Sequence, residues 1–453
     1  MTNIIIADPI EKNNRLESLI KAQPTSEFNK RDTGLKLRTF LITFTLYLSL
    51  LGKITLEEMA NRCCAVQGGG LSLTKQALSA RLEAGSKELK ALLTATINSA
   101  TESKPEKQIT PIILGRFESV NITDATTITL PEKLKDKHKG CGGDGSKAAL
   151  KIQATYEVKS KDFRMIEIID NATENDHTYV SRLVEEAKTN ELFIFDLGYY
   201  GVDGFLKISA KGAYFISKIK TNVNIYDTEG KKMDLYALLC SGDKIDVMIM
   251  IRGGNGETMT VRLTGVRLPE KVYSERLRKA NKEARKSGKT LSKQDKERLK
   301  WILIITNVES DILSFDAICE LYRIRWQIEL IFKSWKSYFK LGEMNNVGKN
   351  YLDCLILGKL IVITSMTNLY SSLYHLVLCS MGRRLSFLRF MKNIRSELDN
   401  IASIIIQGLD ESLFIALINR VVRSSLLDKR RRHTTEETLA ALDLPEEVLR
   451  MLC

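Results

Sequence analysis

The spacing of hydrophobic positions changes along the chain and predicts helical ends around a strand-rich middle. Residues 1–114 carry apolar positions at helical intervals, with a dense apolar segment at Leu37–Leu51. From about residue 115 to 222 the runs become short or alternating. We expect strands at 120–124, 150–158, 165–169, 192–195 and 214–219, with a helix over 177–188. Strands interleaved with a helix in this order predict an α/β domain with a mixed sheet.

A second strand-containing block, residues 223–300, precedes a long helical region. Strands are expected at Val247–Arg252 and Met259–Leu263, followed by a basic helical stretch and a further strand, Trp301–Val308. From about residue 315 the spacing predicts helices to the end of the chain. The apolar segment Leu360–Leu378 is long enough to span a bilayer, but its polar positions favour a buried helix.

Residues 55–82 contain a short pattern with two interpretations. A Thr55 cap opens a helix, three glycines follow at 68–70, and a basic helical segment is expected over 72–82. This order is compatible with a helix-turn-helix that binds DNA, although the turn is long for that motif. An ordinary helical hairpin explains it equally well.

Composition indicates the class of binding partner and the cellular compartment. The 453 residues carry a net charge of +13, which indicates a polyanionic partner, either nucleic acid or an acidic membrane surface. Residues 271–300 hold 12 Lys or Arg against 4 Asp or Glu, and this bias favours nucleic acid. Eight cysteines without a C-x-x-C pair, only four histidines and early acidic residues argue against a Cys/His metal site, a disulfide framework and a secretory signal. We therefore expect a cytoplasmic protein with reduced thiols.

Residues 321–336 form the most informative segment. Taken as one helix at about 100° per residue, it places a carboxylate, a phenol and three cations within a wedge of about 80°. These residues are Tyr322, Arg325, Glu329, Lys333 and Lys336. The apolar residues of the segment fall on an adjoining face that can pack. Ion pairing between successive turns is one explanation of the charges, and a functional site is the other.

Two aspartates favour the functional site. Asp124 lies at the expected end of the first strand, and Asp196 ends the apolar strand 192–195. Together with Glu329 they can supply three carboxylates to hard divalent cations. Phosphodiester cleavage by two metal ions about 4 Å apart needs such ligands, with cations nearby to hold DNA phosphates.

The spacing Tyr322-x-x-Arg325-x-x-x-Glu329, with Lys336 seven positions further on, resembles the Y-R-E-K signature of DDE transposases from bacterial insertion sequences. The resemblance is to the cut-and-paste family with a strand-rich insertion before the catalytic glutamate. The segments that begin at Asp124 and Asp196 are similar to the first and second catalytic blocks of that family. The aspartates are 72 residues apart and Glu329 follows 133 residues later, which suits an insertion in the second gap.

The resemblance implies an RNase H-like catalytic core in which Asp124, Asp196 and Glu329 bind two Mg²⁺ or Mn²⁺ ions. It also implies DNA contacts near the cleaved phosphate from Tyr322, Arg325, Lys333 and Lys336. Trp301 resembles the tryptophan of the family that stacks on a flipped base, and Trp326 can share this role. For Trp301, a core position at the start of a strand is an equally open interpretation.

The implied organisation has five segments and a homodimer bound to double-stranded DNA. They are an N-terminal helical segment for DNA-end binding (1–114), the first part of the core (115–222), an insertion (223–300), the second part of the core with the signature helix (301–345) and a C-terminal helical segment for dimerisation (346–453). The implied activity is cleavage at terminal inverted repeats and joining of the 3′-OH to target DNA. A structure-selective metal-dependent nuclease and a non-enzymatic DNA-binding protein are the alternatives.

Overall fold

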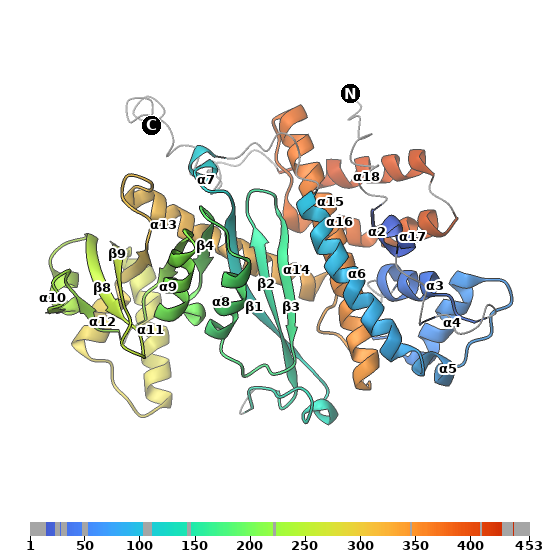
Figure 1. The fold of residues 1–453 in the computed structure, drawn as a ribbon, viewed down its shortest axis with the longest axis horizontal. Coiled ribbons are helices and arrows are strands. Elements are labelled where there is room, and N and C mark those ends of the chain that lie inside the picture. Colours follow the sequence, from blue (N-terminus) through green and yellow to red (C-terminus); the bar gives the residue numbers. More distant parts are fainter. Residues whose placement is uncertain are drawn as a thin grey trace. The chain divides into compact units, whose positions relative to one another are not determined.

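The chain forms two compact units, each assembled from segments that are far apart in the sequence (Figure 1). The computed structural model describes residues 15–22, 28, 34–47, 53–102, 111–142, 146–220, 223–344, 347–407, 410–427 and 438. Unit 1 comprises residues 1–109, 125–173 and 327–430, and unit 2 comprises residues 110–124, 174–326 and 431–453. Strand β1 (Val120–Thr129) contributes to both units.

Ten strands are hydrogen-bonded in the order β3-β2-β1-β4-β5-β10-β9-β8-β6-β7. Their bounds are β2 Ala149–Glu157, β3 Asp162–Ile169, β4 Leu192–Phe195, β5 Tyr214–Lys218, β6 Ile225–Tyr226, β7 Lys232–Met233, β8 Lys244–Arg252, β9 Thr258–Arg267 and β10 Trp301–Thr306. β1, β4 and β5 run parallel to one another. The pairs β2–β3, β5–β10, β10–β9, β9–β8, β8–β6 and β6–β7 are antiparallel. The order β3-β2-β1-β4-β5 is that of the expected RNase H-like core, so the predicted α/β class with a mixed sheet is confirmed.

In unit 2 the strands β4 and β5 pack against helices through aromatic side chains. All four residues of β4 are buried, as expected for a strand that is covered on both faces. Phe205 of α9 stacks on Phe215 of β5 with ring centroids 4.2 Å apart. The ring centroids of Phe195 and Tyr199 are 5.8 Å apart. The helices of this unit are α7 Ile112–Gly115, α8 His177–Glu186, α9 Val202–Ala210, α10 Leu235–Cys240, α11 Glu270–Lys286, α12 Lys293–Leu299 and α13 Phe315–Ile324, with a 3-10 turn at Leu197–Tyr199.

Unit 1 is built around α15 (Lys349–Met381), which packs against α6 and β3. This helix is long and apolar enough to cross a membrane, but 83% of its most apolar window is buried within the structure. The predicted buried helix is therefore confirmed. The other helices are α2 Arg15–Ala22, α3 Leu37–Ile42, α4 Leu56–Gln67, α5 Lys75–Ser79, α6 Leu82–Glu102, α14 Trp326–Ser337 (from residue 327), α16 Phe387–Ser396, α17 Leu398–Gln407 and α18 Glu411–Ser425, with a π-helical turn at Thr43–Tyr47 and a 3-10 turn at Glu132–Leu134.

Several element predictions needed correction. β1 continues five residues beyond Asp124, so this aspartate lies within the strand and not at its end. The basic stretch 271–300 forms two helices, α11 and α12, and the helix expected over 72–82 is limited to α5. The Thr55 cap is present, since its hydroxyl accepts a hydrogen bond from the amide of Glu58. Glycines 68–70 all have positive φ, which explains why the chain turns there.

Candidate active site

The sheet register brings two of the predicted carboxylates together. β1 and β4 are parallel neighbours, and Thr123 pairs with Phe195 in their register. The next residue on each strand is an aspartate, Asp124 or Asp196. Because adjacent parallel strands lie about 4.8 Å apart, residues at the same level are close. The two aspartates therefore lie side by side in unit 2.

Arg325 lies between these two carboxylates. Its guanidinium places Nη1 3.3 Å from Oδ2 of Asp124 and Nε 3.7 Å from Oδ1 of Asp196. The Arg325 side chain is 13% exposed, so solvent screens these ion pairs less than it screens pairs on the surface. One cation thus compensates two negative charges that would otherwise repel each other.

Two further side chains contact Asp196. The Tyr322 hydroxyl donates a hydrogen bond to Oδ1 over 3.3 Å, and Lys218 Nζ lies 4.0 Å from the same oxygen. The Lys218 ammonium also lies 5.3 Å from the centre of the Tyr322 ring. Burial raises the pKa of the Tyr322 phenol, and the Asp196 charge raises it further. Tyr322 therefore acts as a neutral hydrogen-bond donor to Asp196.

The signature segment is two helices and not one. α13 ends at Ile324, Arg325 is its C-cap residue, and α14 begins at Trp326. Arg325 keeps helical backbone angles (φ −49°, ψ −32°), so its own backbone conformation stays helical. The expected apolar face is confirmed, because its six residues are all buried. They are Leu321, Ile324, Ile328, Ile331, Phe332 and Trp335.

The other signature residues lie on α14. Glu329 is half-buried in the first turn of the helix, four residues after Arg325. Lys333 and Lys336 follow on the same helix, and both are exposed. Asp124, Asp196, Tyr322 and Arg325 belong to unit 2, whereas these three residues belong to unit 1. Their roles at the site stay predictions.

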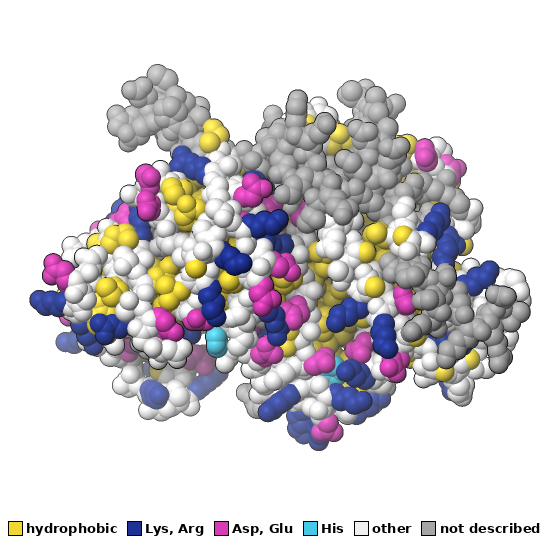
Figure 2. Space-filling model, in the orientation of Figure 1, with side chains coloured by type: hydrophobic (Ala, Val, Ile, Leu, Met, Phe, Trp, Pro, Cys, Tyr) yellow, Lys and Arg dark blue, Asp and Glu magenta, His cyan; other side chains and the backbone are white. Residues whose placement is uncertain are grey.

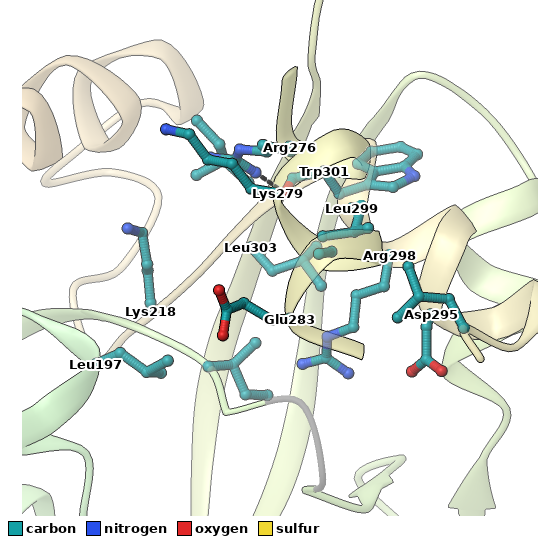
Figure 3. A pocket seen from close by; sticks show the side chains of 14 residues that line it. Leu197, Lys218, Arg276, Lys279, Glu283, Asp295, Arg298, Leu299, Trp301 and Leu303 are labelled. Atoms are coloured by element: carbon teal, nitrogen blue, oxygen red, sulfur yellow. Dashed lines mark hydrogen bonds between the residues drawn. The ribbon is translucent and has the colours of Figure 1, made fainter. Parts of the chain in front are cut away.

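The two predicted base-stacking tryptophans have opposite environments. Trp301 begins β10 and is only 3% exposed, whereas Trp326 is 58% exposed. Trp301 lines a pocket of about 580 Å³ in unit 2, and Lys218 lines the same pocket (Figure 3). Trp326 follows Arg325 directly, so it presents an aromatic face to solvent beside the signature arginine.

Two further charged residues, Lys218 and Asp176, lie near the segment 196–199 and were not predicted from the sequence. Lys218 ends strand β5, and a charge after an apolar strand was the signal that could have identified it. Asp176 is the second. A Cβ atom added to Gly198 would lie 3.1 Å from Asp176 Oδ2, so the Asp176 carboxylate packs closely against this glycine. Asp176 precedes α8 and resembles an ordinary helix cap, but its side chain makes no capping hydrogen bond.

Three acids, Asp124, Asp176 and Asp196, lie near a buried tyrosine. Burial raises the pKa of the Tyr199 phenol far above its ordinary value, and the nearby charges of Asp176, Asp124 and Asp196 raise it further. Unit 2 therefore concentrates negative charge near Tyr199, and Arg325 and Lys218 offset part of it.

The donor set of Asp124 and Asp196 fits a divalent metal ion. Mg²⁺ and Mn²⁺ prefer hard carboxylate oxygens, and two such groups converge here on a single positive centre. Within the described part of the chain, however, no group of three His, Cys, Asp or Glu side chains is arranged to hold a metal ion. The position between the two aspartates that a cation would favour is taken by the Arg325 guanidinium.

The sequence is similar to that of known proteins over most of the chain. A family model described as transposase DDE domain matches residues 115–364. The chain is 28% identical over 388 residues to the transposase for insertion sequence element IS1151 of Clostridium perfringens, covering 81% of each protein. It is 25% identical over 362 residues to the transposase for element IS231B of Bacillus thuringiensis subsp. berliner, covering 76% of this chain and 75% of the relative.

Among solved structures, the piggyBac transposase synaptic complex with hairpin DNA is similar over 99% of this chain and 93% of that chain, with a TM-score of 0.47 and 10% identity. The family match alone spans more than half of the 453 residues and includes all three predicted carboxylates. The chain therefore belongs to the DDE transposase family, as its Y-R-E-K signature predicted.

Proposed function

We propose that this transposase binds the terminal inverted repeats of its insertion sequence, cleaves the DNA ends by two-metal phosphoryl transfer and joins the freed 3′-OH to target DNA. The observation that carries the proposal is the convergence of Asp124 and Asp196 on Arg325, with Tyr322 bonded to Asp196. In this proposal Glu329 is the third carboxylate.

Each side chain has a defined task in this proposal. Asp124, Asp196 and Glu329 would hold two Mg²⁺ or Mn²⁺ ions, which supply charge neutralisation at the scissile phosphate and a reactive oxygen nucleophile. Tyr322 positions Asp196 through its hydroxyl. Arg325 offsets part of the carboxylate charge in the DNA-free protein, and its planar guanidinium can bind a phosphate oxygen when DNA is present.

The remaining predicted contacts belong to the same proposal. Lys333 and Lys336 would bind phosphates near the cleaved bond, and Trp301 and Trp326 would stack on an unpaired base. Trp326 has the exposure that this role needs, whereas Trp301 would have to act from within the wall of its pocket. Residues 1–114 would bind the DNA ends, and helices of 346–453 would form the homodimer. The protein would act on the bacterial nucleoid in the cytoplasm.

The test separates DNA binding from cleavage. Asp124→Ala, Asp196→Ala and Glu329→Ala should each abolish Mg²⁺-dependent cleavage of a DNA duplex that carries the terminal repeat. The three variants should still bind this duplex, because they remove metal ligands and no cation.

Asp203→Ala is the matched control, since Asp203 is an exposed carboxylate that pairs with Lys207 over 2.8 Å on α9. This variant should cleave like the wild type. Persistent cleavage by Asp196→Ala would reject the assignment of the site.

A further inference from the structure

The insertion helix α11 has more Lys and Arg than Glu residues, and none of its residues is buried. Seven of its seventeen residues are Lys or Arg and three are Glu. On the face drawn in Figure 2, Lys and Arg side chains are interspersed with Asp and Glu, so charge composition alone singles out no surface there. The arrangement of the charges around the α11 axis is therefore decisive.

Four exposed cations share one side of α11. At about 100° per residue they fall within a wedge of about 60°, and at 1.5 Å per residue they extend over roughly 21 Å of the helix axis. They are Lys271, Arg278, Lys282 and Arg285, and together they are called the α11 stripe. Glu275 lies at the edge of the wedge, which leaves a net charge of about three on this side.

The opposite side of α11 attaches the helix to unit 2. Arg276, Ala280 and Glu283 line the pocket of Figure 3, and Arg276 Nη1 donates a hydrogen bond to the Trp301 carbonyl over 3.1 Å. Glu283 forms an ion pair with Lys286 over 3.1 Å. By contrast, no carboxylate of the described residues lies within ion-pair distance of a stripe cation. The stripe thus carries charge that the surrounding structure does not compensate.

We infer that the α11 stripe binds the phosphate backbone of duplex DNA, a proposal that rests on the proposed function and adds a second DNA-binding surface to it. A length of 21 Å matches about six base pairs, since successive phosphates of one strand advance about 3.4 Å along the duplex axis. Unpaired cations replace condensed counterions on DNA, and two of the four are arginines, which can bind phosphate through two hydrogen bonds. Such contacts are independent of base sequence.

A membrane surface does not suit this helix. Helices that lie in a membrane interface need a continuous apolar face opposite the charged one. In α11 the opposite side faces a pocket within unit 2, and it carries Arg276 and Glu283. Duplex DNA is thus the polyanion that fits the stripe.

The test measures how DNA binding depends on salt. A triple variant, Lys271→Gln, Arg278→Gln and Arg285→Gln, removes three stripe cations and keeps good helix formers. Binding to a 40-base-pair duplex of mixed sequence is followed by fluorescence anisotropy from 50 to 300 mM KCl. The slope of log K against log [KCl] should become shallower by about 2 to 3, and affinity at 0.1 M should fall by at least about tenfold.

The matched control removes three exposed lysines elsewhere in unit 2, by Lys211→Gln, Lys231→Gln and Lys232→Gln. It should leave the slope close to that of the wild type. Equal slopes for the stripe variant and the control would overturn the proposal. It would also be overturned if the stripe variant lost binding to polyglutamate, an acidic polypeptide, but bound the duplex as the wild type does. Circular dichroism checks that the variants are folded. The single variant Lys282→Gln should make the salt slope shallower by about 0.9.

This experiment also separates the stripe from the proposed function. At DNA concentrations that saturate the stripe variant, cleavage of a terminal-repeat duplex should persist, because the carboxylates are intact. A wild-type protein that neither binds nor cleaves DNA would refute the proposed function. A wild-type protein that cleaves, beside a stripe variant with an unchanged salt slope, would refute the stripe alone.

Discussion

Arg325 controls the charge balance between Asp124 and Asp196. Its guanidinium lies between the two carboxylates and offsets one of their two charges, so a divalent ion must compete with it for this position. We predict that Arg325→Ala enlarges the Mg²⁺-induced rise in melting temperature, because the ion alone then relieves the repulsion between the carboxylates. DNA cleavage should be lost in the same variant, since the phosphate contact is removed. Thermal unfolding at increasing MgCl₂ concentrations measures the first effect.

Arg323→Ala is the control for this experiment. Arg323 is an exposed neighbour that pairs with Glu320 over 2.7 Å, so its variant should show the wild-type response to Mg²⁺. A response of Arg325→Ala no larger than that of the wild type would show that Arg325 does not compete with the ion.

At this scale the sequence predicted part of the site. Spacing and residue type identified Asp124, Asp196, Tyr322 and Arg325, and the structure brings these four together. Asp176 was not identified, because an aspartate before a helix has the same pattern whether it caps the helix or packs against a distant segment, as Asp176 does against Gly198. Only the fold distinguishes the two cases.

At the scale of elements, α15 carries a buried lysine with a structural role. Lys359 is 1% exposed, and its ammonium donates hydrogen bonds to the carbonyls of Lys340 over 2.6 Å and Glu343 over 3.3 Å. Burial lowers the pKa of Lys359 from 10.5 to about 8. Between these two values the unfolded chain binds more protons than the folded one. The Lys359 contribution to stability therefore increases as pH rises through this window.

We predict that the free energy of unfolding of the wild type, relative to Lys359→Met, increases by about 2 kcal/mol between pH 7.5 and pH 9.5. Urea denaturation at the two pH values measures this difference. Lys392→Met alters an exposed lysine of α16, and its free energy of unfolding should change with pH as that of the wild type does. A difference between the wild type and Lys359→Met that does not change with pH would contradict the role of burial.

Hydrophobic periodicity predicted most strands of the core, but two element boundaries differ from the prediction. Neither a glycine nor a proline marks the interruption between α13 and α14 at Arg325, so the sequence does not predict it. β1 continues beyond Asp124, and residues 126–129 alternate between buried and exposed. Position 124 resembled a strand end because a carboxylate rarely lies within a buried strand without a partner.

For the whole molecule, the five segments expected along the sequence differ in kind from the two observed units. Periodicity predicts which face an element buries and does not predict which distant element covers it. Unit 1 combines three separate parts of the chain, residues 1–109, 125–173 and 327–430. The strand-rich insertion, by contrast, was predicted from a local change in pattern, and its strands β8 and β9 pair over nine positions.

The insertion and the helical flanks make this molecule larger than a nuclease core, and this size bears on its reaction. A nuclease or resolvase needs only the carboxylate site, whereas a transposase must also hold a cleaved end and a target. We predict that the wild type joins precleaved terminal-repeat duplexes with free 3′-OH ends to a supercoiled plasmid in the presence of Mg²⁺. Gel analysis should show branched and linear products that carry the labelled end.

Glu329→Ala should give no joined product, whereas Asp203→Ala should join as the wild type does. Nicking of the plasmid without transfer of the labelled end would identify a nuclease, even if Asp124 and Asp196 prove essential. Because the ends are supplied already cut, a defect in terminal-repeat cleavage cannot mask the result. The joining step therefore tests whether the same carboxylates that cut DNA also direct a 3′-OH to a new phosphate.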